Sequence, residues 1–478
     1  MEPIAAPESI DLIALAPVLV LTVFAIGVLV LDLFAGKSKI LLAFVSLVGL
    51  LMTAISAFAK LNLPAHSFND SYIVDHLSIF FILIFTISSA LSILISIDFN
   101  NREGIKAGEY YALILFCTVG MILLASSTDL IMVFLGIEIV SICLYVLAGI
   151  RRNDIKSNEA SLKYFLLGAF ATGFLLYGMA LMYGATGTTN MLKIAALIKS
   201  GSVNSEPLMV MGVVFLVIGF GFKVASVPFH MWAPDVYEGA PSPVTAFMAV
   251  GPKAAAFAAF FRIFAEALPD VSSAWETLLY VIAVLTMFIG NLGAIMQTNI
   301  KRLLAYSSVS HVGYILIAIM VKNSLGSASL LFYMLAYTFM IFGAFGIVII
   351  LGKKGNENLE IEGYSGLGFK HPMLALSMTI FLLSLGGLPP FAGFVAKFYI
   401  FSAAISEGYI YLVVIAVLNS AISFYYYLKV VVFMYMKDPV GEFKISASPI
   451  TLFVVAVAVI GTLELGIFPD PIISLAHP

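Results

Sequence analysis

The sequence predicts an all-α protein that crosses a membrane many times. The chain has 478 residues, of which 62% are hydrophobic and only 11% are charged. Its mean hydropathy is +1.08, and the apolar residues gather in windows long enough to span a bilayer, which takes about 20 residues. Soluble domains do not have this composition. The net charge of −3 and the lack of a basic block exclude nucleic acid as a partner.

About fourteen apolar windows follow one another along the chain. The connections between them are short, so nothing outside the membrane is large enough to be a further domain. The windows lie near residues 11–35, 40–59, 73–97, 109–126, 129–149, 160–184, 207–232, 243–267, 275–297, 301–321, 327–351, 372–402, 409–436 and 448–468.

Loop charge predicts the orientation, because basic residues stay on the cytoplasmic side of a membrane. Alternate connections carry Lys37, Lys39, Arg102, Lys106, Arg151, Arg152, Lys156, Lys301, Arg302, Lys353, Lys354, Lys370, Lys437 and Lys444. We therefore expect a multi-pass protein of a bacterial cell (inner) membrane with both termini on the outer, periplasmic side. The acidic N-terminus lacks the basic start of a cleaved signal, so the first window is expected to be retained. The loop with Asp235 and Glu238 is an exception, because it is assigned to the cytoplasmic side although it is acidic.

The windows also predict an internal repeat within a single transmembrane domain over 1–478. About 174 residues separate Lys223 from Lys397, and a similar offset relates Glu138 to His311 and Lys253 to Lys429. The offset spans five helices, an odd number, so the second copy is inverted. We expect N-terminal helices 1–3 over 1–107, a first repeat of helices 4–8 over 108–270, an inverted second repeat of helices 9–13 over 271–438, and helix 14 over 439–478.

Three lysines lie inside apolar windows, next to prolines that we expect to break the helix. Lys223 precedes Pro228, Lys253 follows Pro252, and Lys397 follows Pro389 and Pro390. A charge at the centre of a bilayer helix costs roughly 2.5–3.5 kcal/mol, and backbone groups freed by proline survive only against protein or a wet cavity. Discontinuous helices 7 and 12 with buried lysines therefore indicate an ion path.

Other intramembrane polar residues have two interpretations each. Glu138 needs a partner, by type Lys223, and the two form either a proton-transfer pair or a fixed ion pair between helices. His311 bridges the lysines through water or is a hydrogen-bonded core histidine. Lys429 belongs to the path or snorkels to the interface. Near window ends, Lys163, Arg262, Asp32 and Glu464 fit snorkelling, and Asp129 fits a helix N-cap.

The chain has no motif for a redox cofactor. We find no site for a nicotinamide, a flavin, a haem or an iron–sulfur cluster. The two cysteines, Cys117 and Cys143, lie in separate apolar windows without metal-ligand spacing and are expected to be small core residues. We therefore expect no cofactor and no metal in this chain.

Four motifs resemble a known family. They are Val-Pro-Phe-His-Met-Trp-Ala-Pro-Asp-Val-Tyr-Glu-Gly-Ala-Pro at 227–241 with Phe222-Lys223 before it, and the stretches at 163–170, 297–311 and 386–390. Together they resemble the antiporter-like membrane subunits of NADH–quinone oxidoreductase, respiratory complex I. The likeness covers essentially the whole chain, and sodium/proton antiporter subunits share the broken-helix plan.

This resemblance implies a proton-translocating subunit of an enzyme whose redox chemistry is done elsewhere. It implies an ion pair of Glu138 and Lys223 on the fifth and seventh helices, a central relay at Lys253 and a terminal lysine at Lys397, with His311 on the same polar axis. It also implies FMN and iron–sulfur clusters in partner subunits. The implied partners are antiporter-like subunit M, small membrane subunits toward the quinone-binding region, lipid and protons.

Two rival functions remain. A Mrp-type cation/proton antiporter would work without redox partners and would use carboxylates and carbonyls for its cation, whereas the mid-membrane charges here are mostly lysines. A scaffold that assembles the membrane arm without conducting protons would tolerate loss of Lys223 and Lys253. Proton uptake by such variants separates the three.

Overall fold

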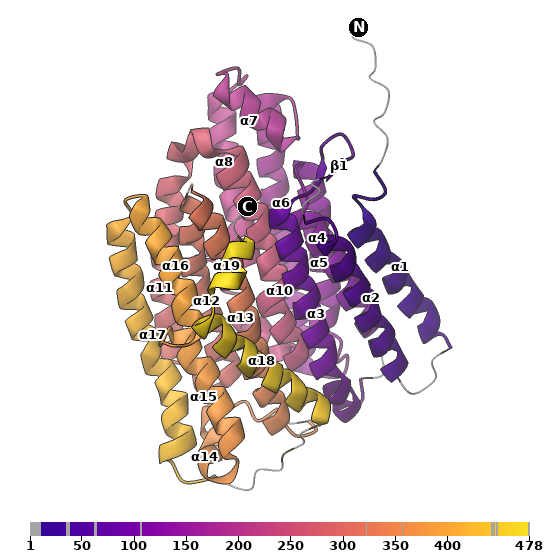
Figure 1. Ribbon diagram of the computed structural model, residues 1–478, viewed down its shortest axis with the longest axis vertical. Coiled ribbons are helices and arrows are strands. Elements are labelled where there is room, and N and C mark those ends of the chain that lie inside the picture. The colour runs from indigo at the N-terminus through magenta and orange to yellow at the C-terminus, as the bar shows by residue number, and fades with distance from the viewer. Residues whose placement is uncertain are drawn as a thin grey trace.

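Helices make up most of the computed structural model, and they run side by side along its long axis (Figure 1). The structure describes residues 11–34, 39–61, 65–105, 108–321, 323–355, 357–440, 445 and 448–476. Lys37, Lys106 and Lys444, which the orientation argument used, lie outside the described residues, as does the N-terminal stretch before Asp11.

The N-terminal part holds four long helices and a small hairpin. Its elements are α1 (Ala16–Asp32), α2 (Ile40–Phe58), β1 (Ala65–Ser67), β2 (Tyr72–Val74), α3 (His76–Glu103) and α4 (Glu109–Ala125). The strands pair antiparallel, with His66 opposite Ile73. The Asp75 carboxylate accepts from the Ser78 amide at 2.8 Å and the Ser78 hydroxyl accepts from the Asp75 amide at 2.9 Å, a capping box that fixes the start of α3.

The middle of the chain carries the first predicted break. Its elements are α5 (Leu130–Ala148), α6 (Ile155–Thr186), α7 (Met191–Lys199), α8 (Glu206–Val224), α9 (Ala233–Gly239), α10 (Ser242–Phe261), the π-helical turn η1 (Arg262–Ala267) and the 3-10 turn η2 (Pro269–Ala274). Helix α8 ends at Val224 because Ala225 adopts a left-handed conformation with φ of 63°. The chain then turns into the separate short helix α9.

The C-terminal part carries the second break. Its elements are α11 (Glu276–Ile295), α12 (Ile300–Met320), α13 (Ser324–Leu351), η3 (Ile361–Tyr364), α14 (Leu367–Lys370), α15 (Pro372–Gly386), α16 (Ala392–Ser406), α17 (Ile410–Met436), α18 (Pro449–Ile467) and α19 (Asp470–Ala476). Gly387, with φ of 92°, ends α15 in a conformation that suits glycine.

The predicted all-α membrane fold is confirmed. Among the described residues, 12 helices are long and apolar enough to cross a membrane, and three shorter apolar helices, α1, α15 and α16, accompany them. Helices are interrupted at both predicted places, after α8 and between α15 and α16. The number of fourteen crossings and their inverted arrangement stay predictions.

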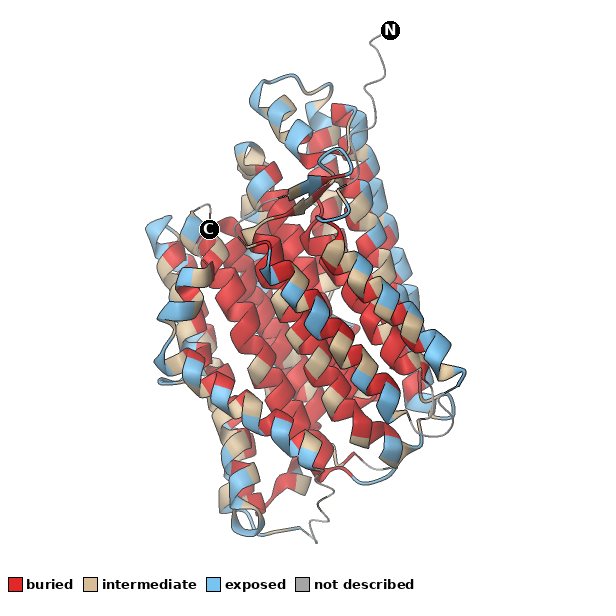
Figure 2. Ribbon diagram, turned by 45° about the vertical axis from the view of Figure 1, so that its right-hand side comes forward, coloured by how far each residue is buried: buried red, intermediate tan, exposed pale blue. Residues whose placement is uncertain are grey.

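Three helices form the centre of the bundle. Their best membrane windows are 100% buried in α10 with η1, and 94% buried in each of α12 and α13, whereas those of α2, α6, α17 and α18 are 39% buried. Figure 2 shows buried residues through the interior and exposed ones along the outer helices. Lys253 and His311 lie on these central helices and are 3% and 2% exposed.

The expectation that Pro252 breaks its helix is wrong. Helix α10 runs without interruption from Ser242 to Phe261, and every residue of it is buried. Neighbouring helices enclose it closely; a Cβ on Gly251 would lie 2.9 Å from the Ser88 hydroxyl of α3. Packing on all sides holds a helix that proline alone would kink.

The starts of α5 and α12, which we call the two corners, have matching backbone hydrogen bonds. Leu130 N donates to Thr189 O at 3.0 Å and Met191 N to Thr128 O at 2.8 Å; 170 residues later, Ile300 N donates to Leu359 O at 2.7 Å and Ile361 N to Thr298 O at 2.8 Å. Asp129 and Asn299 cap the helices that start there. These corners support two related copies and confirm Asp129 as an N-cap.

The pairing of Lys223 with Lys397 within that repeat is wrong. Lys223 belongs to α8, before its break, whereas Lys397 belongs to α16, after its break. The offset between Lys223 and Lys397 suggested equivalent positions, because apolar windows in a sequence do not show where a broken helix ends and resumes.

Removing either corner cap tests their equivalence. We expect Asp129→Ala and Asn299→Ala each to lower the free energy of unfolding by about 1 kcal/mol, since each leaves helix amides without an acceptor. The measurement is reversible unfolding in mixed micelles. Ser377→Ala is the control, because this exposed hydroxyl donates to Met373 O within α15 and caps nothing. A loss at only one of the two corners would contradict their equivalence.

Candidate functional site

Three buried or partly buried lysines differ in how well the protein satisfies their ammonium groups. Lys223 Nζ, at the end of α8, donates to Ser141 Oγ at 2.9 Å and Thr172 Oγ1 at 3.2 Å. Lys253 Nζ, in α10, donates to Ser308 Oγ of α12, its one hydrogen-bond acceptor in the described part of the chain. An ammonium has three donors, so Lys253 depends most on water.

Lys397 is the best satisfied of the three. Its Nζ donates to Leu385 O at 3.1 Å, Gly386 O at 2.8 Å and Ser420 Oγ at 2.8 Å. The two carbonyls are free because α15 ends there, and a helix leaves its last carbonyls without partners. The helix break thus supplies a polar site for a cation in an apolar setting.

Glu138 does not form a direct ion pair with Lys223. No ion pair within 4.0 Å joins them among the described residues, and the hydroxyl of Ser141, one turn along α5, takes that place. The Glu138 carboxylate still acts on Lys223 at longer range. Its Oε1 atom is buried without a hydrogen-bond partner in the described chain, next to the exposed stripe that holds Leu135 and Ile142.

His311 interacts electrostatically with both Lys253 and Lys397. Its Nδ1 is 2.6 Å from Tyr333 Oη and its Nε2 is 3.3 Å from Tyr427 Oη. The side chain is 2% exposed. The imidazole therefore has partners on both nitrogens, as either predicted role requires.

Sequence reasoning missed a group of tyrosines beside this histidine. The rings of Tyr337 and Tyr314 lie 5.1 and 6.0 Å from the His311 ring, and Lys397 Nζ lies 4.8 Å from the Tyr314 ring. The hydroxyls of Tyr314, Tyr337, Ser310 and Tyr237 are buried without hydrogen-bond partners in the described structure. Buried hydroxyls without protein partners take up water. Helical spacing to His311 along α12 was the available signal for Tyr314.

Lys397 also lines a cavity at the side of the bundle. A cavity of about 440 Å³ lies between α16 and α17. Its lining is mainly apolar and includes four phenylalanines, and its polar side chains are Lys397, Ser402 and Ser420. Lys429, by contrast, is not brought to this group; its Nζ donates to Gln297 O at 3.1 Å, just past the end of α11. A cation is favourable at a helix C-terminus, which agrees with the snorkelling interpretation.

The side predicted to be cytoplasmic holds ion pairs that sequence reasoning missed. Lys301 is 0% exposed and donates to Ala240 O at 2.7 Å and to Glu357 at 3.2 Å, and Arg151 pairs with Glu357 at 2.9 Å. Burial would raise the pKa of the Glu357 carboxyl, but the charges of Lys301 and Arg151 and a hydrogen bond from Ser242 hold it below its usual value. The acidic loop at Asp235 and Glu238 is likewise neutralised, by Lys163, Lys156 and Arg302.

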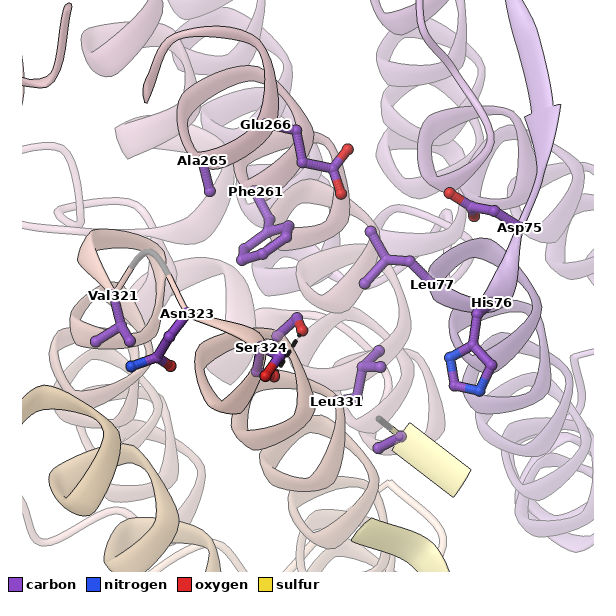
Figure 3. A pocket seen from close by; sticks show the side chains of 12 residues that line it. Asp75, His76, Leu77, Phe261, Ala265, Glu266, Val321, Asn323, Ser324 and Leu331 are labelled. Atoms are coloured by element: carbon purple, nitrogen blue, oxygen red, sulfur yellow. Dashed lines mark hydrogen bonds between the residues drawn. The ribbon is translucent and has the colours of Figure 1, made fainter. Parts of the chain in front are cut away.

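At the opposite end of α10, a pocket of about 330 Å³ opens between α3, η1 and α13. Figure 3 shows Asp75 and Glu266 at this pocket on two different elements, with Leu77 and Phe261 nearby. Arg262, 3% exposed, joins them; it donates to Asp75 at 2.6 Å, Glu266 at 3.1 Å and Ala125 O at 2.6 Å. Arg262 is thus buried and paired and does not snorkel.

Comparisons with known proteins agree with this architecture. Residues 127–423 match the family model described as NADH:quinone oxidoreductase/Mrp antiporter, TM. A chain of respiratory complex I from Thermus thermophilus superposes with a TM-score of 0.83 at 34% identity, covering 97% of this chain and 100% of that one. A chain of the Mrp complex from Dietzia sp. DQ12-45-1b gives a TM-score of 0.83 at 22% identity over 98% and 96% of the two chains, which is evidence of the fold alone.

Fold and buried lysines together define the antiporter-like class of membrane subunits. NADH-quinone oxidoreductase subunit N of Trichlorobacter lovleyi is 49% identical over 98% of this chain and 97% of that protein. The chain belongs to the NADH-quinone oxidoreductase subunit N family, as an integral multi-pass membrane protein.

Arg262→Gln tests the paired arginine. We expect it to lower the free energy of unfolding by about 1–3 kcal/mol, because it removes a buried donor from the partly exposed Asp75 carboxylate and from Ala125 O. Arg152→Gln is the control, since this arginine is 82% exposed in its pair with Glu109 and such pairs contribute about 0–1 kcal/mol. The measurement is unfolding in mixed micelles.

The pH dependence of that loss follows from Asp75. Burial would raise the pKa of this carboxyl, but the Arg262 charge and its hydrogen bonds hold it below its usual value. Such a group stabilises the fold above its unfolded pKa, about 3.9, and stops doing so as pH falls through the lower folded value. The native protein should therefore keep this contribution from about pH 7 to about pH 5. In Arg262→Gln, burial without the guanidinium raises the Asp75 pKa, so the difference between the two proteins should be equal or smaller at about pH 5; a difference that grows as pH falls contradicts the pairing.

Proposed function

We propose that this chain translocates protons across the membrane as a membrane-arm subunit of NADH–quinone oxidoreductase. Electron transfer from NADH to quinone, with FMN and iron–sulfur clusters, belongs to partner subunits. The chain contributes buried groups that bind and release protons. As part of that enzyme it is a translocase subunit without a redox centre of its own.

One observation carries the proposal: Lys253 lies on a fully buried helix with a single protein acceptor, beside His311 and the water-requiring hydroxyls around it. A structural lysine in such a position would be fully paired, as Lys301 is. An ammonium that depends on water is poised to lose its proton when its surroundings change. His311 and Lys397 continue the polar path from there.

The coupling we propose is electrostatic. A change of charge near Glu138 alters the charge state of Lys223, which alters the proton affinity of Lys253 and then of Lys397. At an effective dielectric of 20, a unit charge at about 8 Å contributes roughly 2 kcal/mol. Moving one proton against 100 mV costs roughly 2.3 kcal/mol. A few such charges are therefore strong enough to work against the membrane potential.

We also propose where this chain lies and which subunits it contacts. We propose a bacterial inner membrane, with both termini on the periplasmic side and two inverted repeats in one domain. Glu138, whose free oxygen lies beside the exposed stripe of α5, would face small membrane subunits toward the quinone-binding region. The cavity at Lys397 would face antiporter-like subunit M.

Lys253→Met tests the function. We expect NADH-driven proton uptake into inverted membrane vesicles to fall about tenfold or more, equivalent to at least 1.4 kcal/mol, because the central proton carrier is gone. Lys193→Met, at an exposed site on α7, is the control and should leave uptake unchanged. Native gels check assembly of the complex in both.

The same variants separate the rivals. Full proton uptake in assembled Lys253→Met complex would favour a scaffold. Sodium-driven proton movement without NADH would favour an antiporter. Reduced uptake coupled to NADH oxidation supports the proposal over both.

Lys429→Met tests whether this lysine belongs to the path. Since its Nζ is bound to Gln297 O at the end of α11, we expect proton uptake to change less than about twofold, a difference of roughly 0.4 kcal/mol. A loss like that of Lys253→Met would restore Lys429 to the relay.

A further inference from the structure

Helix α18 lies on the outside of the bundle at a slant (Figure 1) and packs against α3, α13, α15 and α16. One stripe of it is buried, with the spacing of three and four residues that a helix face has. The stripe consists of Thr451, Val454, Val455, Ala458, Gly461, Thr462 and Leu465. This outer helix therefore touches both α15 and α16, the two helices on either side of the second break.

Gly466, near the C-terminal end of α18, lies directly against the main chain of this break. A Cβ on Gly466 would lie 2.7 Å from Phe391 C and 2.8 Å from Ala392 N, and it would overlap Pro390 O. All three are backbone atoms, which cannot swing aside as the end of a side chain can. Since non-bonded carbon atoms rest about 3.5–4.0 Å apart, an added methyl group would displace α18 or the break by roughly 1 Å.

A second glycine joins the break to the end of α15. Gly393, in the first turn of α16, has no room for a Cβ against Ser384 O, and its amide donates to the Ser384 hydroxyl at 3.0 Å. Ser384 directly precedes Leu385 and Gly386, whose carbonyls accept from Lys397 Nζ. A displacement of the break thus moves the carbonyls through Ser384, and it moves the ammonium through α16.

The Lys397 side chain has little room to follow such a displacement. It is 4% exposed and packs on Gly387, where a Cβ would lie 3.0 Å from Lys397 Cδ and 3.2 Å from its Nζ. The two carbonyl oxygens lie 3.1 and 2.8 Å from Nζ. N–H···O hydrogen bonds extend to about 3.2 Å, so a further separation of roughly 1 Å would break both.

We propose that Gly466 is a positioning residue for Lys397. Through it, α18 holds the break at the distance that lets the carbonyls of Leu385 and Gly386 accept from the ammonium. Glycine is required because the main chain of the break occupies the space that a side chain would need. This inference rests on the proposed function, since it assigns Gly466 to the proton path that contains Lys397.

Gly466→Ala tests this role, because it adds one methyl group and no charge. We expect NADH-driven proton uptake per assembled complex to fall about fivefold or more, as a misplacement of roughly 1 Å near reacting groups does. The pH profile of uptake should move as well, since the two carbonyls stabilise the protonated form of Lys397. A defect of folding alone would lower the amount of complex on native gels and leave both quantities unchanged.

Gly461→Ala is the matched control on the same helix. Its added Cβ would lie 2.8 Å from Cγ of the Phe339 ring on α13 and not against the break. Overpacking of this kind lowers stability, but uptake per complex and its pH profile should stay native. Equal losses in Gly461→Ala and Gly466→Ala would overturn the positioning role, because crowding anywhere on α18 would then have the same effect.

The remaining outcomes separate this role from the proposed function. Native uptake and a native pH profile in Gly466→Ala, while Lys253→Met loses uptake, overturn the positioning role and leave the proposed function standing. Full uptake in both variants overturns the proposed function itself. If Gly466→Ala prevents assembly, Ser384→Ala replaces it, because it removes the hydroxyl that holds Gly393; an unchanged pH profile there overturns the positioning role.

Discussion

An ammonium group inside an apolar bundle must find acceptors, and this constraint shapes the molecule. Each of the three lysines meets it differently: Lys223 with two hydroxyls, Lys253 with one, and Lys397 with two carbonyls and a hydroxyl. The break before α16 provides carbonyls where an unbroken helix would have none to spare. The buried centre of α10, α12 and α13 keeps lipid away from Lys253.

Partial satisfaction separates Lys253, which we propose carries protons, from the structural charges. Lys301 and Arg262 are as buried as Lys253, but each has both carboxylate and carbonyl partners. Fully paired charges are fixed in one state and hold helices together. Lys253 and the tyrosines near His311 lack such pairing, so their energies depend on water and on nearby charge, as proton transfer demands.

Sequence reasoning predicted the class of fold, the apolar windows and both broken helices, because hydropathy and proline are local signals. It failed where packing between helices determines the structure. Pro252 does not break α10, since enclosure by neighbouring helices holds the helix together. Glu138 was expected to pair directly with Lys223, but Lys223 donates to Ser141 instead. A serine in an apolar run does not indicate such a contact. The tyrosines beside His311 come from α12, α13 and α17. An apolar window predicts one helix but does not predict which helices pack together.

The acceptors at Lys397 have a consequence for how this site changes over evolutionary time. Two of them are main-chain carbonyls of Leu385 and Gly386, and every amino acid carries the same carbonyl. Point substitutions at these positions leave the oxygens in place as long as the chain keeps its course. The cation site is thus encoded in the path of the backbone, and drift in the surrounding side chains erodes it slowly.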